Sequence, residues 1–441
     1  MAHAAQANSR PGLLGLTPYQ WLVLFAAWLG WGFDVFDGLL FNFVSPLCVP
    51  TLLGLEIGSP AAHDATAYWT GVLTSLLLVG WAIGGIAFGW VADRIGRTRT
   101  LLLTMLTYAL ATLACAFAPN LATLAVFRFV ASLGIGGEWA AGASLVAESV
   151  PEEKRVISGA LLYTSAPMGL FLATFVNDLL TRQIDVLAAR PDIAWRYVFA
   201  TGLVPAFVAV AIRWKVREPA HWTGGEHPRL RELFAPAMRM RTFGGLAVAI
   251  VALITWWSVN AFLPMIARYL ADTVVPPPPP ADLPAMRVAF VTTATSVFNL
   301  GGLIGTLLTV PVAVHLGRRP MFLIYFAASA VAIWLTFGFG FEPETRLYLV
   351  GLIGLTVFGV FGAFTFYLPE LFPTRLRATG SGFTYNAGRV ATAVGPFLVG
   401  WVAASGTDPL VVVRWVALVP LLGIGLVLAR LVPETRGESL G

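Results

Sequence analysis

Twelve apolar segments, each long enough to cross a lipid bilayer as a helix, dominate this 441-residue sequence. A bilayer core of about 30 Å requires about 20 residues of helix. The segments lack the alternating pattern of barrel strands, and lipid admits only helices or closed barrels, so we expect twelve membrane-spanning helices and an all-α membrane fold. The predicted spans are 20–46, 68–92, 99–118, 121–146, 156–180, 195–214, 243–270, 288–314, 320–340, 347–369, 378–403 and 409–430.

The composition excludes several classes of protein. Hydrophobic residues make up 57% of the chain and charged residues only 12%, about half the ~25% of a soluble domain. A soluble enzyme, a disordered chain and a nucleic-acid binder are therefore excluded, and the lipid bilayer is the expected environment. The sequence has no nucleotide-binding fingerprint and no metal-ligand spacing, so we expect no cofactor, no metal and no enzymatic activity. A single disulfide between Cys48 and Cys115 remains open at this point.

Basic residues between the spans indicate the orientation of the chain. Of the 28 Lys and Arg residues, 19 lie in the segments on one side of the membrane and six on the other, while Arg128, Arg268 and Arg389 lie within spans. Cytoplasmic loops carry the excess of such residues. We therefore expect a multi-pass protein of the cytoplasmic (inner) membrane with both termini in the cytoplasm.

The longest polar stretch between spans divides the chain into two halves of six helices. We expect a cytoplasmic tail at 1–19, a six-helix bundle at 20–214, a cytoplasmic linker at 215–242, a second six-helix bundle at 243–430 and a cytoplasmic tail at 431–441. Because both halves belong to one chain, we expect a functional monomer.

An internal repeat relates the two halves. The pattern E-x-x-P-x-x-x-R follows the fourth span at 148–155 and the tenth span at 370–377. At the same offset, Tyr163 of span five corresponds to Tyr385 of span eleven. Two parallel, pseudo-symmetric six-helix halves are one of the known transporter architectures, with a binding site near the membrane midplane.

Three segments resemble the major facilitator superfamily. Residues 89–99 (GWVADRIGRTR) are similar to its signature loop, G-x-x-x-D-R-x-G-R-[RK], with Thr98 in place of the usual basic residue. The second copy, at 314–319, lacks the acidic residue, and 433–437 (PETRG) is similar to the end of sugar and organic-ion porters. The resemblance covers nearly the whole chain and implies the major facilitator fold.

A narrower resemblance is to proton-coupled symporters of organic acids, namely aromatic acids, sialic acid and other carboxylates. It rests on residues 32–38 (GFDVFDG), 128–139 (RFVASLGIGGEW) and 371–389. It implies alternating access, a small organic anion as substrate and the proton as coupling ion.

Carboxylates at membrane depth are the first candidate functional residues. Asp34 and Asp37 are three residues apart and therefore share one helix face. Two ionised carboxylates so close repel each other, which favours protonation of at least one and suits proton coupling. Either one or both could instead pair with Arg128 to hold helices together. Glu138 is a second candidate proton site or a structural partner for a basic residue.

Arg389 is the main candidate for binding an anion, because its planar fork matches a carboxylate in two hydrogen bonds. Tyr385 and Asn386 lie beside it in the sequence. Arg128 either binds the anion or neutralises the aspartates of span one.

Aromatic and amide side chains could wall the ligand, although each is more often a packing residue. The candidates are Tyr163, Trp256, Asn260, Tyr367 and Tyr385.

Charged residues at the predicted cytoplasmic ends of the helices form a candidate gate. The resemblance implies that such residues hold the two halves together in the outward-open state, and ion pairs in partial water suit a contact that must break and reform. The alternative is ordinary interfacial anchoring. The candidates are Asp93, Arg94, Arg97, Glu148, Arg155, Glu370 and Arg377.

The sequence therefore predicts a secondary active transporter that moves a small organic anion together with protons. A proton-coupled sugar or polyol porter, or a drug or metabolite exporter of the same fold, is the alternative.

Overall fold

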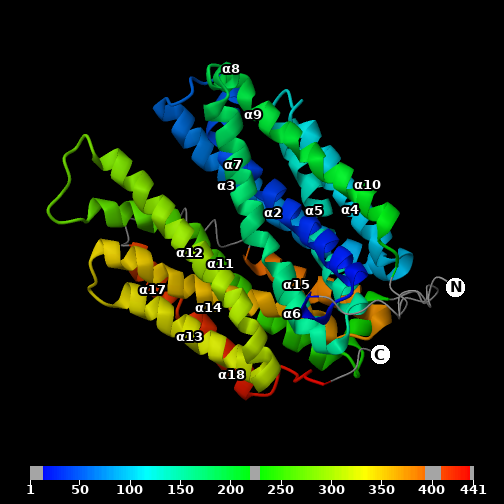
Figure 1. Cartoon of the computed structure of the whole chain (residues 1–441). Coiled ribbons are helices and arrows are strands. Elements are labelled where there is room, and N and C mark those ends of the chain that lie inside the picture. The colour runs from blue at the N-terminus through cyan, green and yellow to red at the C-terminus, as the bar shows by residue number, and fades with distance from the viewer. Residues whose placement is uncertain (1–12, 219–228, 393–408, 438–441) are drawn as a thin grey trace. The chain divides into compact units, whose positions relative to one another are not determined.

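A computed structural model describes residues 13–218, 229–392 and 409–437 (Figure 1). Within these ranges all regular secondary structure is helical, and there is no β-strand. The helices group into two compact units. Among the described residues, unit 1 comprises 13–218, 229–234 and 372–390, and unit 2 comprises 235–371, 391–392 and 409–437.

Unit 1 contains the N-terminal helices together with most of α15. Four long helices follow one another in the chain and are succeeded by shorter ones. Their bounds are α2 (Pro18–Leu53), α3 (Pro60–Ile95), α4 (Arg97–Cys115), α5 (Leu121–Ser149), α6 (Arg155–Tyr163), α7 (Ser165–Asp178), α8 (Asp185–Ala188), α9 (Pro191–Ala200), α10 (Val204–Lys215) and α15 (Arg377–Thr392).

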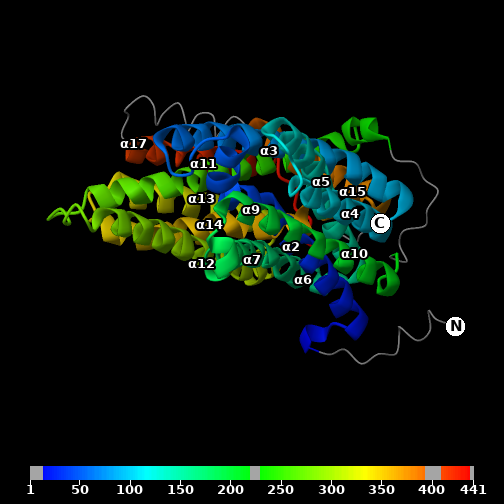
Figure 2. The same ribbon diagram turned by 90° about the horizontal axis from the view of Figure 1, so that it is seen from above.

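Unit 2 contains the remaining helices that the structure describes. Its helices α12, α13 and α14 lie side by side (Figure 2). The bounds are α11 (Arg239–Asp272), α12 (Leu283–Leu316), α13 (Arg318–Gly338), α14 (Pro343–Glu370), α17 (Pro409–Trp415) and α18 (Leu418–Leu428).

The described residues contain nine helical segments that are long and apolar enough to cross a membrane, if Glu152–Thr181, which includes α6 and α7, is counted as one. The other three predicted spans coincide with shorter helices. Span 195–214 is divided between α9 and α10, span 409–430 is divided between α17 and α18, and α15 covers the first part of span 378–403. The rest of that span lies outside the described residues.

Glycines allow the helices of unit 1 to pack with their backbones close together. A Cβ atom on Gly84 of α3 would collide with the carbonyl of Leu133 on α5, and one on Gly136 of α5 would collide with the carbonyl of Trp81 on α3. Small residues at such crossings are typical of membrane helices. The Gly-rich segment of α5 is therefore a packing surface, and it fixes the side chains that follow it.

Unit 1 extends beyond the predicted N-terminal bundle. It includes described residues of the predicted tail and linker, and it also includes residues 372–390 from the predicted C-terminal half. The reason is direct contact: side chains at the start and middle of α15 bind residues of α3 and α5, as described below. Cys48 and Cys115 form no disulfide in this structure, and both free thiols are buried.

Candidate functional site

Asp37 and Arg128 form a buried ion pair inside unit 1. Nη1 of Arg128 on α5 lies 2.8 Å from Oδ1 of Asp37 on α2. Nη2 of the same guanidinium donates to the carbonyls of Asp37 and Gly38, both at 3.2 Å. The hydroxyl of Thr112 on α4 donates to Oδ2 of Asp37. The Asp37 carboxylate thus has a partner on each oxygen, which is how a charge at membrane depth is normally accommodated.

Asp34 lies one helical turn before Asp37 but is bonded differently. Its side chain is fully buried, and neither carboxylate oxygen has a hydrogen-bond partner among the residues that the structure describes. The charged side chains that act on it electrostatically are Glu138, Asp37 and Arg389. A buried carboxylate without hydrogen bonds is costly in its ionised form, so this position is suited to holding a proton.

Glu138 is the second buried carboxylate near Asp34. The hydroxyl of Thr104 on α4 donates to Oε2 of Glu138 at 3.1 Å. Its Oε1 lies so close to Gly30 of α2 that a Cβ atom there would collide with it. Glu138 therefore occupies the junction of α2, α4 and α5, and only a glycine at position 30 leaves room for it.

Arg389 of α15 lies between two aromatic rings in the same unit. Its guanidinium carbon is 4.0 Å from the centre of the Trp81 ring on α3 and 4.7 Å from that of Tyr385. The side chain is buried. The negative faces of the rings stabilise the cation, and the Asp34 carboxylate attracts it as well.

A continuous aromatic cluster, consisting of Trp31, Trp139, Tyr163 and Tyr385, extends away from Arg389. Trp139 stacks on Tyr385 with ring centres 4.3 Å apart and a 27° angle between the planes. Trp31 meets the rings of Tyr163 at 4.8 Å and Trp139 at 6.4 Å, edge to face in both cases. Two of the predicted wall residues are thus brought together with a buried cation.

Asn386 points toward α3, where its side chain occupies the space that a Cβ atom on Gly85 would need. Its Nδ2 donates to the carbonyl of Gly382 at 3.0 Å, within its own helix. This arrangement makes Asn386 a helix-packing residue of α15 in this structure, at the edge of the aromatic cluster.

The other predicted wall residues belong to unit 2. Trp256 packs with Trp257 at 4.9 Å and with Phe358 at 6.0 Å, and Asn260 is half-buried in the same helix, α11. The hydroxyl of Tyr367 donates to the carbonyl of Pro433 at 3.1 Å, so this residue fastens the segment after α18 to α14.

At the end of unit 1 where α3 stops, four of the predicted gate residues form one ionic cluster. Arg97 lies 2.9 Å from both Asp93 and Glu148, and Arg377 lies 2.8 Å from the same oxygen of Glu148. Arg97 also donates to the carbonyl of Thr374 at 2.7 Å. All four side chains of this rim cluster are almost completely buried.

Asp93 has a further role, because its carboxylate caps the N-terminus of α15. It accepts hydrogen bonds from the backbone amides of Ala378 at 3.2 Å and Thr379 at 2.7 Å, and from the Thr379 hydroxyl at 2.6 Å. The first amides of a helix lack partners within that helix. The rim cluster therefore attaches the beginning of α15 to α3 and α5.

The three remaining gate candidates are placed differently, although Arg155 acts electrostatically on Arg377 of the rim cluster. The guanidinium of Arg94 sits 3.6 Å above the Trp90 ring, and Arg155 is buried at the start of α6. Glu370 belongs to unit 2, where Arg318 binds both of its oxygens at 2.8 and 3.1 Å.

Two helix-capping glutamates were not predicted. The Glu218 carboxylate accepts from the backbone amides of Arg97, Thr98 and Arg99 at 2.7, 3.2 and 3.1 Å. The Glu434 carboxylate accepts from the corresponding amides of Arg318 and Arg319 at 2.9 and 3.0 Å. The repeat contained a signal for them, since each glutamate follows the last helix of a predicted half.

Four other site residues were also missed: Thr104, Thr112, Trp81 and Trp139. Thr104, Thr112 and Trp81 belong to no motif, and Trp139 ends the segment 128–139 without a role that its sequence position reveals. Only the packing of α3, α4 and α5 around α2 reveals their roles.

Comparison with known proteins agrees with the fold and with the signature segments. Residues 20–273 and 245–440 match the Major Facilitator Superfamily, and the chain belongs to that family. It is 30% identical over 439 residues to a probable 4-methylmuconolactone transporter of Cupriavidus pinatubonensis, covering 96% of this chain and 93% of the relative. It is also 30% identical over 366 residues to the cis,cis-muconate transport protein of Acinetobacter baylyi, covering 81% and 84%.

Among solved structures, the chain is similar to the proton:xylose symporter XylE of E. coli. The TM-score is 0.74 with 16% sequence identity, and the match covers 96% of this chain and 98% of XylE. At this identity the likeness concerns the fold, which is the major facilitator fold of two six-helix halves. The protein is thus a multi-pass membrane transporter and not an enzyme.

Proposed function

We propose that this transporter moves a small organic anion, a carboxylate, together with protons by alternating access. The observation that carries the proposal is the presence, within unit 1, of both a buried carboxylate without hydrogen bonds and a buried guanidinium close to two aromatic rings. These two groups are Asp34 and Arg389. The separate Asp37–Arg128 ion pair supports a division of roles, with Asp37 structural and Asp34 carrying the proton.

Coupling follows from competition for the charge of Arg389. When Asp34 is ionised, its carboxylate attracts the guanidinium and offsets the positive charge that a substrate anion needs. When Asp34 takes up a proton, that competition ends and Arg389 is available to a substrate carboxylate, which it can bind through two hydrogen bonds. Substrate and proton therefore bind together, which is the requirement for symport.

Glu138 provides a second protonation site in this scheme, because it acts electrostatically on Asp34. An ionised Glu138 disfavours ionisation of Asp34, so a proton on either carboxylate relieves their mutual repulsion.

The aromatic cluster supports a planar organic acid as substrate. Trp139 and Tyr385 place ring faces beside Arg389, and flat unsaturated molecules stack favourably on such faces. Relatives named as transporters of muconate and of 4-methylmuconolactone support the same substrate class.

The distribution of basic residues supports a location in the cytoplasmic membrane with both termini inside. In that orientation the rim cluster lies on the cytoplasmic side, where it would close the inner entrance until substrate and proton have bound. Two halves in one chain support a functional monomer. We propose no cofactor apart from the coupling proton.

Uptake by purified protein in liposomes with an imposed inward proton gradient tests this function. The substrates to compare are muconate, aromatic acids, short monocarboxylates, sialic acid, sugars and cationic dyes. We expect accumulation of an organic acid only when the gradient is present. Acid uptake at the same rate with and without the gradient would exclude proton coupling. Transport of a sugar or dye instead of any acid would favour a polyol porter or an exporter.

A further inference from the structure

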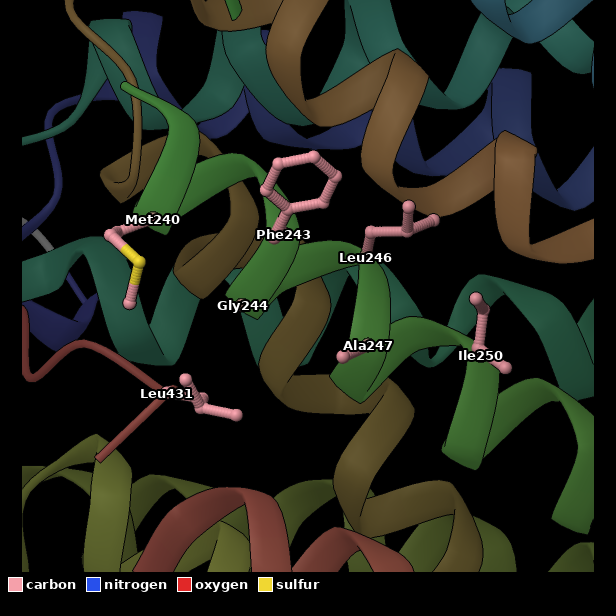
Figure 3. Close-up of a pocket in the computed structure, with 7 residues that line it drawn as sticks. All are labelled: Met240, Phe243, Gly244, Leu246, Ala247, Ile250 and Leu431. Atoms are coloured by element: carbon pink, nitrogen blue, oxygen red, sulfur yellow. The ribbon is translucent and has the colours of Figure 1, made fainter. Parts of the chain in front are cut away.

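An apolar pocket of about 270 Å³ lies in unit 2, beside the N-terminal part of α11 (Figure 3). Met240, Phe243, Ala247 and Ile250 line it from one stripe of that helix, and Leu431 closes it from the segment after α18. Met240 and Leu431 lie at one end of the pocket in Figure 3 and Ile250 at the other. The pocket therefore runs along the helix from its first residues.

Gly244 explains why a pocket forms here. A Cβ atom at this position would collide with the carbonyl oxygen of Leu431, so the backbone of α11 touches the segment after α18 directly. The larger side chains on either side of the glycine stand away from this contact. Met240 and Phe243 are both 52% exposed, which leaves an apolar surface that faces outward from unit 2.

Two arginines are the sequence neighbours of Met240 and Leu431, the lining residues at one end of the pocket. Arg239 directly precedes Met240, and Arg430 directly precedes Leu431. Both are exposed, and neither forms an ion pair within the part of the chain that the structure describes. Nearby Arg241 differs, since it donates to the carbonyl of Leu371 at 3.3 Å.

Arg430 has an unusual backbone conformation for its residue type. Its φ of 60° lies in the left-handed region that glycine normally occupies after a helix. A glycine would adopt this conformation more easily, so the arginine side chain is retained at a conformational cost. A ligand for the guanidinium is one physical reason to keep it.

The position along α11 indicates which molecule fits. Its 34 residues correspond to a helix of about 51 Å, longer than the ~30 Å hydrocarbon core, so its first residues project into the headgroup region. A ligand here meets cations at the membrane surface and apolar side chains beneath them. An anionic phospholipid matches this arrangement, because its phosphate lies at the membrane surface and its acyl chains lie beneath it.

We propose that this pocket binds an anionic glycerophospholipid, with the phosphate between Arg239 and Arg430 and an acyl chain against Met240, Phe243 and Ala247. Inorganic phosphate has no part that would occupy the apolar stripe. A lipid without net charge would leave both guanidinium groups uncompensated. The expected selectivity is therefore for phosphatidylglycerol over phosphatidylcholine.

The test counts the lipids that stay bound to the full-length purified protein in native mass spectrometry, after exchange into nanodiscs of phosphatidylglycerol and phosphatidylcholine. The head variant is Arg239→Gln with Arg430→Gln. The tail variant, Ala247→Phe, fills the pocket without changing charge. The control, Arg99→Gln with Arg231→Gln, removes two exposed arginines elsewhere. Circular dichroism and thermal unfolding of each variant confirm that it is folded.

We expect the wild type and the control to retain phosphatidylglycerol preferentially. In the head variant the ratio of bound phosphatidylglycerol to bound phosphatidylcholine should be roughly tenfold lower. The tail variant should retain less of either lipid. Equal retention of the two lipids by the wild type would overturn the proposal, as would unchanged phosphatidylglycerol binding in both the head and the tail variants. These outcomes do not depend on transport, so they are independent of the proposed substrate.

Discussion

Asp34 and Asp37 illustrate how two identical side chains on one helix face acquire different roles. Asp37 is bonded to Arg128 and Thr112, whereas Asp34 has no hydrogen-bond partner in the described ranges. Removing the charge of Asp37 leaves the buried Arg128 guanidinium without its counter-ion, which typically costs 3–5 kcal/mol. Removing the charge of Asp34 breaks no hydrogen bond.

Asp34→Asn and Asp37→Asn should therefore have opposite signatures. We expect Asp34→Asn to keep its unfolding temperature and to lose accumulation against a gradient, while exchange of substrate across the membrane persists. Asp37→Asn should unfold at a markedly lower temperature. Thermal unfolding in detergent and uptake in liposomes provide the two readings, and full accumulation by Asp34→Asn would exclude it as the proton carrier.

Arg389 should be sensitive to the shape of its head group as well as to charge. Arg389→Lys keeps the cation but loses the planar fork that binds a carboxylate through two hydrogen bonds. We expect KM for the transported acid to rise by about tenfold or more, corresponding to about 1.4 kcal/mol. Arg268→Lys, at an exposed position of α11, serves as the matched control. An unchanged KM in Arg389→Lys would argue against direct contact with the substrate.

The sequence locates the charged residues within the spans, but it does not identify the residues that contact them. A carboxylate or guanidinium within a span stands out because lipid makes it costly, so Asp34, Asp37 and Arg389 could be identified directly. Thr112 and Trp81 could not, because their importance depends on which residues of other helices they face. The sequence left open whether Asp37 or Asp34 pairs with Arg128, and the structure shows that Asp37 does.

At the scale of elements, the start of α15 depends on a carboxylate from another helix. The Asp93 carboxylate on α3 accepts hydrogen bonds from the backbone amides of Ala378 and Thr379. In Asp93→Ala these amides lose their acceptor, at a cost of about 1 kcal/mol by analogy with helix caps. We expect hydrogen exchange at these amides to accelerate about fivefold. The variant Glu153→Gln, at an exposed site near the same end, should change nothing, and equal protection in Asp93→Ala would refute the capping role.

The cap of α13 should make the stability of unit 2 depend on pH. Partial burial acts to raise the pKa of Glu434, but hydrogen bonds from the backbone amides of Arg318, Arg319 and Arg436 outweigh it and hold the pKa below its usual value. A lowered pKa in the folded state means that the stabilisation is present above the ordinary pKa near 4.5 and disappears as pH falls through the folded value.

The variant Glu434→Gln tests this dependence. At neutral pH it should be less stable than wild type by about 1 kcal/mol, and the difference should shrink as pH falls below about 4.5. Unfolding temperatures across pH measure it, with Glu56→Gln as a control at an exposed loop site. A difference that stays constant down to pH 3 would contradict the assigned hydrogen bonds.

Element-level prediction was accurate for the long apolar helices, because hydropathy over 20 residues is a strong signal. It missed interruptions that depend on local packing. Predicted span 156–180 is divided into α6 and α7 at Thr164, whose hydroxyl accepts from Trp28 Nε1 of α2 at 2.9 Å. Nothing in the hydropathy of the segment marks this position.

At the scale of the whole molecule, the sequence predicted the fold through the repeat and the signature loop. The repeat has a physical counterpart: Arg97 binds Glu148 in unit 1, and Arg318 binds Glu370 in unit 2. What the sequence did not predict is the placement of α15 with unit 1. That grouping rests on contacts between segments far apart in the chain, such as Glu148 with Arg377, which no local pattern encodes.

These contacts between segments far apart in the sequence suggest a role for the rim cluster during transport. If the start of α15 is released from α3 and α5 in each cycle, weakening the cluster should shift the transporter between its two open states. Glu148→Gln removes the carboxylate shared by Arg97 and Arg377. We expect a cysteine introduced at the exposed end of this region, in Arg375→Cys, to react faster with a membrane-impermeant maleimide in the Glu148→Gln background. An unchanged reaction rate would show that the cluster does not hold this end closed.

Proton movement driven by the substrate is the most direct test of proton symport. Purified protein is reconstituted in liposomes that enclose a pH-sensitive dye, and the transported acid is added outside with no initial pH gradient. If acid and protons move together, the interior should become acidic as the acid is taken up. This acidification should be absent from liposomes without protein and from liposomes with Asp34→Asn. Uptake of the acid by wild type without any change in internal pH would contradict proton symport.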